Sequence, residues 1–485
     1  MELSKEICIR AMRSKDARFD GKFFTGVYST GIYCRPICPA PIPKLKNIQF
    51  FPSAAAASDA GLRPCLRCKP EVAPGFDSSK APGLISKALK LIFDSFPLEI
   101  KVNELARQLQ ISNRHLNRLF QQHLGTTPFS IWNTQKIHFA KRLIDETALS
   151  MSEIAFFAGF NSIRSFNHSF KKCYQKSPSE LRNNKKSTNK DQWVTLHLSY
   201  REPFNWIALL DFLKLRAIPG VEKVFDNGYQ RVIRIGEDTG MIGVSMTNLK
   251  KSKPVFQVKI AFSDNRKLHF ICEKVKKMFN LEAPAAEIDH FLKKDKILKS
   301  SVQQNEGIRV PGCWDPFELC VRAILGQQIS VKGATTISGR IVEKYGQKYQ
   351  GSVINDNQQN WFEFPKASIL KDATFDGIGL TKSRIETLKS FAIAVHQKDI
   401  DFENNFDSEI MVNQLKEIKG IGDWTAQYFA MRALNDPNAF PVSDLGLIKA
   451  VSSPKETVKP KDLLKLSQKW SPWRATAAMY LWRMN

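Results

Sequence analysis

The 485-residue sequence lacks long apolar runs and is short of acidic residues. It has no stretch of about 18 consecutive apolar residues, the length a helix needs to cross a bilayer, and no charged-then-apolar leader. These absences predict a protein that neither spans a membrane nor is secreted, and we expect it to be cytoplasmic. Asp and Glu number 47 against 72 Lys and Arg, which leaves a net charge of +25.

The basic excess favours a polyanionic partner. Most of it lies in the first 190 residues, but the remainder of the chain is basic too. We therefore expect both parts to contact nucleic acid. The alternative is that the charge only keeps the protein soluble, but a pI near 9.6 in a chain of this length favours DNA or RNA.

Cysteine is scarce and unevenly placed, and none follows Cys320. Two close pairs occur near the start, Cys34 with Cys38 and Cys65 with Cys68. In a reducing compartment this clustering favours a metal over disulfides, and four thiolates suit one tetrahedral Zn²⁺ per chain. Chance cysteines or a redox pair are the alternative. Zinc-bound thiolates stay deprotonated at neutral pH, which makes them candidate nucleophiles.

The segments GIYCRPIC and RPCLRC, which contain these cysteines, resemble the zinc domain of Ada-type adaptive-response proteins. The resemblance implies that Cys34 accepts the methyl group of a methyl phosphotriester in DNA, and that Cys38, Cys65 and Cys68 complete the zinc site. Alkylating one thiolate would make the centre less negative and tighten DNA binding. The candidates for holding the phosphate are Arg35, Arg63, Arg67 and Lys69.

A chain of this length is expected to form three or four domains. Two segments rich in turn-forming or polar residues, 73–83 and 183–192, read as linkers. The fold class we predict is multidomain and mainly α. The domains are a small zinc domain at 1–75, an all-α tandem helix-turn-helix domain at 84–182, an α/β subdomain at 193–281 and an all-α helix-hairpin-helix domain at 282–485.

Residues 84–182 show helical spacing of apolar residues in two similar units. The second contains IAFFAGF, then Phe166 and Phe170, and the tandem resembles the AraC-type DNA-binding domain. The resemblance implies that the second helix of each unit enters the major groove. Ser112 and Ser162 would be the N-caps of these helices. The DNA-contacting side chains it implies are Arg114, Asn117, Arg118, Arg164, Asn167 and His168, and an ordinary solvated helix face is the alternative.

Residues 193–281 alternate between short strand-like runs, such as 194–198 and 231–235, and a helix around 206–215. This segment resembles the first subdomain of the 3-methyladenine DNA glycosylase II family. Farther on, two helical patterns flank Gly420-Ile421-Gly422, which is typical of a helix-hairpin-helix that presents backbone N–H groups to a phosphate. Gly420, Gly422 and Thr425 are therefore predicted to contact DNA.

The hairpin is followed by Phe440-Pro441-Val442-Ser443-Asp444-Leu445, one carboxylate in a largely apolar run. This stretch resembles the catalytic loop of the same glycosylase family, which implies that Asp444 is a buried catalytic carboxylate. The alternative is that Asp444 only caps the next helix. In the LGQQIS stretch, Gln327 and Gln328 are expected to approach the minor groove, and Gln328 occupies the position of the family's apolar wedge.

An alkylated base such as 3-methyladenine or 7-methylguanine is cationic, so electron-rich rings should attract it after it is flipped out of the duplex. Trp424, Tyr428 and Trp482 are predicted to form this base pocket, with core packing as the alternative. Arg432 and Arg474 are predicted to hold flanking phosphates. The position after the hairpin where strand-cleaving relatives carry a lysine is Trp424, and cysteine is absent after 320, so we expect a monofunctional enzyme without an iron-sulfur cluster.

The sequence thus predicts a repair protein that acts on alkylated double-stranded DNA as a monomer. It would combine a DNA-3-methyladenine glycosylase, a methyl-accepting Cys34 and a sequence-specific DNA-binding domain, with RNA polymerase as a partner if it activates transcription. The alternative is a methylation-sensing transcription activator whose glycosylase part is an inactive scaffold. No Pro-Cys-His-Arg motif occurs, so removal of O6-methyl groups from guanine is not expected.

Overall fold

The computed structural model describes residues 3–74, 83–98, 100–182, 193–248, 254–351, 360–402, 407–453 and 457–484. The chain divides into two compact units, Met1–Arg201 with Val255–Glu273, and Glu202–Pro254 with Lys274–Asn485. Most of both predicted linkers, residues 75–82 and 183–192, lies outside the described residues. Within the described part, no helix is long and apolar enough to cross a membrane.

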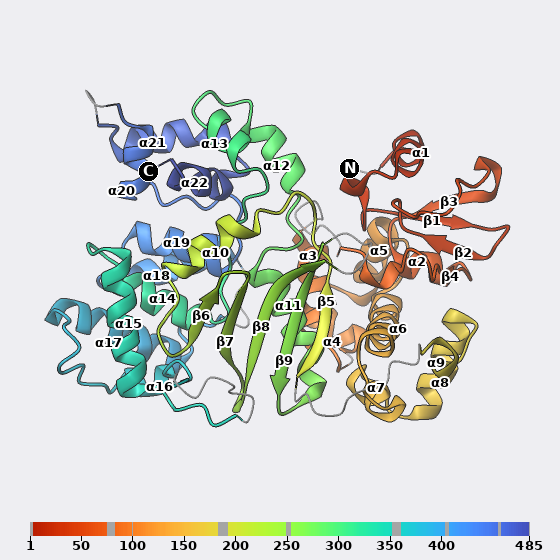
Figure 1. The fold of residues 1–485 in the computed structure, drawn as a ribbon, viewed down its shortest axis with the longest axis horizontal. Coiled ribbons are helices and arrows are strands. Elements are labelled where there is room, and N and C mark those ends of the chain that lie inside the picture. Colours follow the sequence, from red (N-terminus) through yellow and green to blue (C-terminus); the bar gives the residue numbers. More distant parts are fainter. Residues whose placement is uncertain are drawn as a thin grey trace. The chain divides into compact units, whose positions relative to one another are not determined.

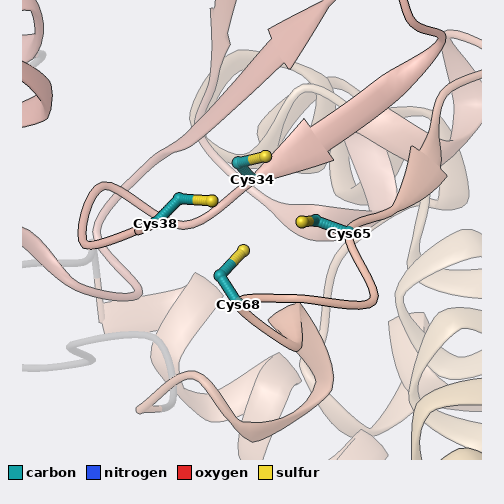
Figure 2. Close-up of side chains that lie close together, drawn as sticks. All are labelled: Cys34, Cys38, Cys65 and Cys68. Carbon is teal, nitrogen blue, oxygen red and sulfur yellow. The ribbon is translucent and has the colours of Figure 1, made fainter. Parts of the chain in front are cut away.

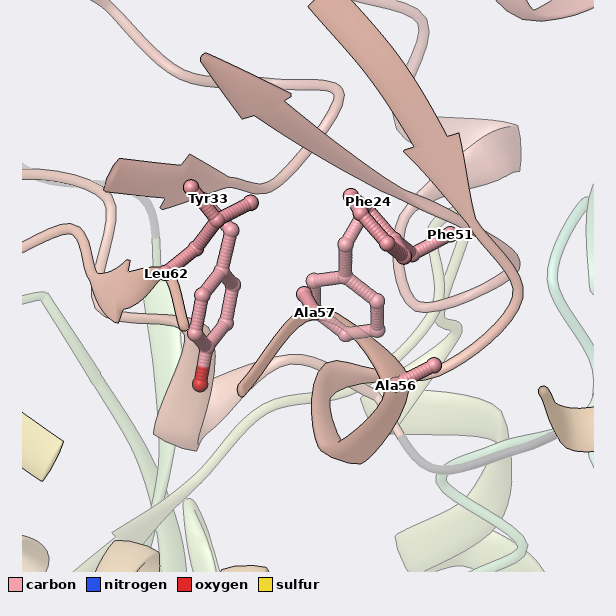
Figure 3. Close-up of a cluster of buried hydrophobic side chains, with 6 residues drawn as sticks. All are labelled: Phe24, Tyr33, Phe51, Ala56, Ala57 and Leu62. Atoms are coloured by element: carbon pink, nitrogen blue, oxygen red, sulfur yellow. The ribbon is translucent and has the colours of Figure 1, made fainter. Parts of the chain in front are cut away.

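Unit 1 begins with a small zinc domain built on a sheet of strand order β3-β1-β2-β4. Its elements are α1 (Lys5–Ser14), β1 (Phe24–Val27), β2 (Ile32–Cys34), β3 (Ile48–Phe51), α2 (Ala54–Asp59), β4 (Arg63–Pro64) and the 3-10 turn η3 (Pro70–Val72). Phe24 and Tyr33 lie between the sheet and α2, with ring centroids 6.0 Å apart (Figure 3). Because β2 and β4 pair in parallel at Tyr33 and Pro64, the two cysteine pairs that follow are brought together.

The predicted tandem helix-turn-helix is present in unit 1 (Figure 1). Its helices are α3 (Gly83–Ser95), α4 (Val102–Gln108), α5 (Asn113–Leu124), α6 (Pro128–Glu146), α7 (Met151–Phe157), α8 (Ile163–Tyr174) and α9 (Pro178–Leu181). The Ser112 hydroxyl accepts a hydrogen bond from the His115 amide at 3.2 Å, and Ser162 caps α8 in the same way through the Ser165 amide at 3.1 Å. Both predicted N-caps are confirmed.

The predicted α/β segment contains the expected strands and helix. In unit 1, β5 (Val194–Leu198) pairs antiparallel with β9 (Pro254–Phe262). In unit 2, β6 (Glu222–Phe225), β7 (Gly228–Ile235) and β8 (Asp238–Asn248) form an antiparallel meander. Helix α10 (Trp206–Lys214) precedes this meander, and the 3-10 turn η5 (Asn265–Lys267) leads into α11 (Leu268–Met278).

The rest of unit 2 is helical. Its helices are α12 (Ala285–Leu292), α13 (Lys299–Gln304), α14 (Pro316–Leu325), α15 (Val331–Tyr345), α16 (Ala367–Leu370), α17 (Lys382–Gln397), α18 (Ser408–Glu417), α19 (Asp423–Ala433), α20 (Leu445–Val451), α21 (Pro460–Ser467) and α22 (Arg474–Trp482). Helix α19 packs against α18 and α14 because Ala426, Phe429 and Ala430 are almost fully buried at helical spacing. Helix α20 packs against α22, which positions the site described next.

Candidate functional site

The four predicted zinc ligands meet at one point. The Sγ atoms of Cys34, Cys38, Cys65 and Cys68 all lie within 4.8 Å of one another and point toward a common centre (Figure 2). Tetrahedral zinc with Zn–S bonds of about 2.3 Å separates its sulfurs by nearly 4 Å, so the cluster fits one zinc ion after a small contraction. Cys65 and Cys68 are buried, whereas Cys34 and Cys38 remain partly exposed. Cys34 is therefore one of the two cluster residues that solvent reaches in part.

Arg35 has a different role from the one predicted. Its guanidinium forms a bidentate ion pair with Asp20 and donates to the Cys68 carbonyl at 3.1 Å, while its amide donates to the Cys68 Sγ at 3.3 Å. The side chain is only 10% exposed, so it braces the cysteine loop and is unavailable to hold a DNA phosphate. Lys69 is paired with Asp145 at 3.0 Å, whereas Arg67 is exposed.

The predicted major-groove side chains lie on α5 and α8. Arg114, Arg118, Arg164, Asn167 and His168 are exposed, and Asn117 is half-buried. Two of them, both in the first helix-turn-helix, already have partners: Asn117 donates to the Asn113 carbonyl and Arg118 contacts His115, both at 3.0 Å. The second helix-turn-helix therefore presents its polar face more openly than the first.

Glycine occurs at the two hairpin positions for different structural reasons. Gly420 has φ +94°, and a Cβ there would lie 2.0 Å from the Thr387 hydroxyl, so no other residue fits without strain. Gly422 is exposed at the N-terminus of α19, and nothing lies within 4 Å of where its Cβ would be. The absent side chain leaves the first amides of α19 open to an anion.

Thr425 and Gln327 interact with each other. Thr425 is 1% exposed, so its side chain faces the protein, and the contact predicted for the backbone N–H groups at this end of the helix stays a prediction. Its hydroxyl and the Gly420 carbonyl both accept hydrogen bonds from the Gln327 side-chain amide at 2.9 Å. These bonds tie the end of α14 to the hairpin. Gln328, the next residue, is exposed and has φ +58°.

Asp444 accepts three hydrogen bonds. Trp424 Nε1 donates to its Oδ2 at 2.9 Å, Trp482 Nε1 donates to its Oδ1 at 2.9 Å, and the Leu447 amide donates to Oδ1 at 3.0 Å. The last bond makes Asp444 the N-cap of α20, so the capping role and a preorganised carboxylate coexist. The carboxylate is half-buried, not buried as expected, because the N-terminus of α20 opens toward solvent.

The three predicted pocket rings are adjacent. Trp424 and Tyr428 stack with centroids 5.3 Å apart and planes 8° from parallel, and Tyr428 lies 6.4 Å from Trp482. The fourth ring, Phe212 of α10, lies 6.3 Å from Trp482 and was missed from the sequence. Phe212 belongs to the apolar run of a helix about 200 residues upstream, and nothing local distinguishes it from a core residue.

A cavity of about 300 Å³ lies beside Phe212 and Trp482. Leu209, Leu215, Arg216 and Met479 also line it. The Arg216 guanidinium lies over the Phe212 ring, 3.7 Å from its centroid. Asp211, Arg309 and Arg483 line it as well. The cavity therefore combines two aromatic rings and aliphatic side chains with three arginines and one carboxylate, groups that can stack on a planar heterocycle and form hydrogen bonds with it.

Arg432 orients Tyr428 and does not hold a DNA phosphate, contrary to our expectation. It is 5% exposed and donates to the Pro311 and Gly312 carbonyls at 2.8 and 2.9 Å and to the Tyr428 hydroxyl at 2.8 Å. Burial opposes ionisation of Tyr428, but Arg432, Arg216 and Arg322 outweigh it and lower the pKa of the phenol. Arg474 is half-buried and donates to Asn438 at 2.8 Å.

Three segments of the chain match known domain families. The metal binding domain of Ada matches residues 7–71, a helix-turn-helix domain matches residues 105–184, and the AlkA N-terminal domain matches residues 195–315. Among solved structures, a 3-methyladenine DNA glycosylase from Archaeoglobus fulgidus shares the fold, with a TM-score of 0.51 at 23% identity. That likeness covers 60% of this chain and 97% of the archaeal chain.

Two curated relatives extend the match. The DNA-3-methyladenine glycosylase 2 of Escherichia coli is 28% identical over 288 residues, which cover 59% of this chain and 95% of that protein. A protein of Mycobacterium tuberculosis named "probable bifunctional transcriptional activator/DNA repair enzyme AlkA" is 34% identical over 483 residues, 98% of this chain and 96% of the relative. This chain therefore belongs to the family of AlkA-type bifunctional transcriptional activators and DNA repair enzymes.

Proposed function

We propose that this protein repairs alkylated double-stranded DNA in two ways. It acts as a monofunctional DNA-3-methyladenine glycosylase that hydrolyses the N-glycosidic bond of bases such as 3-methyladenine and 7-methylguanine, and it accepts a methyl group at Cys34. The observation that carries the glycosylase assignment is the Asp444 carboxylate, which accepts hydrogen bonds from the indole N–H groups of Trp424 and Trp482, and the Trp482 ring also lines the cavity.

Base release follows from this geometry. A flipped, positively charged base enters between electron-rich rings, which attract a cation more than a neutral base. As the bond from the sugar C1′ to the base nitrogen breaks, the electron pair stays on the base and positive charge develops on the sugar. The fixed Asp444 carboxylate stabilises that charge without having to reorganise. Water then adds to C1′ and loses a proton.

Two elements would hold the DNA during this step: the backbone of the hairpin, and the tip between α14 and α15 that carries Gln328. Open amides at the start of α19 suit a phosphate, and the hydrogen bonds from Gln327 keep the tip at a set distance from them. Gln328 is the exposed side chain at the tip and is our candidate for filling the space that the flipped base leaves.

Methyl transfer uses the second site. The Cys34 thiolate attacks the methyl carbon of a methyl phosphotriester, so that an S–C bond forms, the C–O bond breaks and an ordinary phosphodiester leaves with the electron pair. Bound zinc supplies the charge that keeps the thiolate deprotonated near neutral pH. Among the four cysteines, partial exposure favours Cys34 or Cys38 over the buried pair, and the position of Cys34 at the end of β2 agrees with the Ada-type motif.

The tandem helix-turn-helix adds sequence-specific DNA binding, and relatives named as transcriptional activators favour a regulatory function as well. RNA polymerase is then the expected partner. We further propose that the protein works as a monomer in the cytoplasm. The alternative, an activator with an inactive glycosylase scaffold, is disfavoured by the retained carboxylate and aromatic pocket.

The experiment is to incubate methylated duplex DNA with the wild type and with Asp444→Asn and to identify the released bases. We expect release of 3-methyladenine and 7-methylguanine by the wild type and a decrease on the order of 10²- to 10³-fold for the variant. Asp462→Asn, an exposed acid on α21, is the matched control. Full activity of Asp444→Asn would refute the catalytic assignment. No release by the wild type would favour the scaffold alternative. Methyl transfer to Cys34 is measured separately, because both hypotheses expect it.

A further inference from the structure

Helix α6 of unit 1 carries two rows of engaged polar residues. His138, Lys141 and Asp145 are spaced three and four residues apart, so they lie on one face of the helix. Gln135, Arg142 and Glu146, spaced seven and four apart, lie on another. Both Lys141 and Arg142 are less than 8% exposed, which is unusual for charged residues on a helix of a small DNA-binding domain.

The first face contacts the zinc domain. His138 Nε2 lies 3.0 Å from the hydroxyl of Tyr33, the residue that precedes Cys34. Lys141 lies 2.6 Å from Asp145, which also pairs with Lys69 at 3.0 Å. Tyr33 precedes Cys34 and Lys69 follows Cys68, so polar contacts join α6 to the zinc domain next to one cysteine of each pair.

The second face contacts β5. Arg142 Nη2 donates to the His197 carbonyl at 3.0 Å, and the His197 amide donates to Glu146 Oε2 at 2.7 Å. The backbone N–H and C=O groups of His197 therefore both form hydrogen bonds with side chains of α6. Hydrogen bonds to charged partners that are shielded from water contribute more than exposed ones.

The same face also contacts α11 at its start. Gln135 Nε2 lies 2.7 Å from His269 Nε2. The His269 ring is 2% exposed and sits between Phe96 and Phe139, at centroid distances of 4.1 and 5.0 Å. This contact is aromatic as well as polar, and it lies about 70 residues from β5 along the chain.

An uncovered α6 would expose these groups to water at no cost, whereas burying an arginine and a glutamate is costly unless each finds partners. Here Arg142 Nη2 and Glu146 Oε2 both bond to His197, and Gln135 contacts His269, whereas Arg142 Nε has no hydrogen-bond partner in the described structure. The partner segments 194–198 and 265–269 belong to unit 1 but lie within the AlkA N-terminal match at 195–315, apart from Val194. We propose that the face formed by Gln135, Phe139, Arg142 and Glu146 is a docking surface for β5 and the start of α11. The regulatory and repair segments would then stay joined without the covalent connection at 183–192.

The test places a protease recognition sequence within residues 183–192 of the full-length, zinc-loaded protein. After cleavage, the two fragments are passed over a size-exclusion column under native conditions. We expect them to elute together near the 55.1 kDa of the intact chain. Fragments that separate at micromolar concentration would overturn the proposal.

Variants show whether this face is responsible. Combining Arg142→Met with Glu146→Met should weaken the association at least tenfold. The matched control combines Arg107→Met with Glu104→Met, which removes an ion pair whose side chains are 78% and 38% exposed, and should have no effect. Because the α6 variant risks misfolding, His269→Ala in the other fragment provides a second measurement. Unchanged association in both interface variants would also overturn the proposal, and none of these results depends on base release.

Discussion

Asp444, the carboxylate that we propose for catalysis, also has a structural role. One oxygen caps α20 and also accepts from Trp482, while the other accepts from Trp424. Gly446 protects this arrangement, because a Cβ there would lie 3.1 Å from Asp444 Oδ1 and 3.2 Å from Trp482 Cδ1. The carboxylate is therefore held in one orientation before substrate arrives, which is the condition for electrostatic stabilisation of a developing cation.

Trp482→Phe should slow base release ten- to hundredfold. The substitution keeps an aromatic wall but removes one hydrogen bond to a carboxylate, which contributes about 1.5–3 kcal/mol. The measurement is single-turnover release of 3-methyladenine. Trp470→Phe is the control, since Trp470 is fully buried and its Nε1 has no hydrogen-bond partner in the described structure. Equal losses in both variants would indicate that the Trp482 effect comes from packing.

Glu71 is a buried acid that makes stability depend on pH. Burial raises the pKa of its carboxyl to about 7, with Lys141 opposing from 3.9 Å, and neither oxygen has a hydrogen-bond partner in the described structure. The folded state thus holds the proton more tightly than the unfolded state, whose pKa is near 4.5. The contribution of the protonated Glu71 carboxyl to the free energy of unfolding is therefore complete below pH 4.5 and is lost as the pH rises through about 7.

Glu71→Gln should flatten this dependence. Between pH 5.5 and 8, the free energy of unfolding of the wild type should fall by about 2 kcal/mol, a loss that the variant does not show. The measurement is the melting temperature of the zinc-loaded protein at both pH values. The exposed Glu104→Gln is the control, and a wild-type slope in the Glu71 variant would contradict the prediction.

At the scale of elements, the tip between α14 and α15 is joined to the hairpin by side chains. Gln327 bonds to Gly420 and Thr425, and Arg384 donates to the Gln327 carbonyl at 2.5 Å. Gln328 then adopts a left-handed backbone, φ +58°, that residues other than glycine rarely take. Gln328 is our candidate for a contact with DNA at this tip, and its left-handed backbone makes glycine a substitution that the fold accepts.

Gln328→Gly tests that idea. Relief of strain and loss of backbone entropy oppose each other, so the free energy of unfolding should change by less than about 1 kcal/mol. Base release from duplex DNA should nevertheless fall roughly tenfold, because part of the cost of extruding a base, about 1.4 kcal/mol, is no longer offset. Release from single-stranded DNA should not change.

Lys398→Gly provides the comparison for this variant. Lys398 is exposed, has φ +65° and ends α17, so it makes the same backbone change at a site that we do not assign to DNA binding. Equal activity of the two variants on duplex DNA would contradict a role for the Gln328 side chain.

At the scale of the whole molecule, the two chemistries lie in different units. The four cysteines belong to unit 1, and Asp444 with its aromatic neighbours belongs to unit 2. A zinc-selective chelator should therefore abolish methyl transfer to Cys34 and lower the melting temperature of unit 1, because metal binding supplies much of the folding free energy of a Cys₄ domain. Base release at 25 °C should persist.

The measurement uses one methylated DNA preparation for both activities. Methyl label on the protein reports on Cys34, and free methylated bases report on Asp444. Loss of both activities at the same chelator concentration would contradict this division. Restoration of methyl transfer by added Zn²⁺ confirms that the chelator acted through the metal.

The sequence by itself determined those features whose chemistry is local. The cysteine pairs, the capping serines Ser112 and Ser162 and the helix-hairpin-helix are read from neighbouring residues, and the structure contains all of them. Trp424 and Tyr428 are four residues apart, so helix geometry alone places their rings together. Strands 194–198 and 231–235 were likewise predicted from their alternation.

Only the tertiary structure decided which polar groups are already engaged. Arg35, Thr425 and Arg432 look equally available in the sequence, but each meets a partner from a distant segment: Asp20, Gln327 and Pro311 respectively. Phe212 joins the pocket for the same reason, since α10 is brought to Trp482 by folding. The physical cause is that burial and hydrogen bonding depend on which segments pack together, and residue spacing along one segment carries no information about that packing.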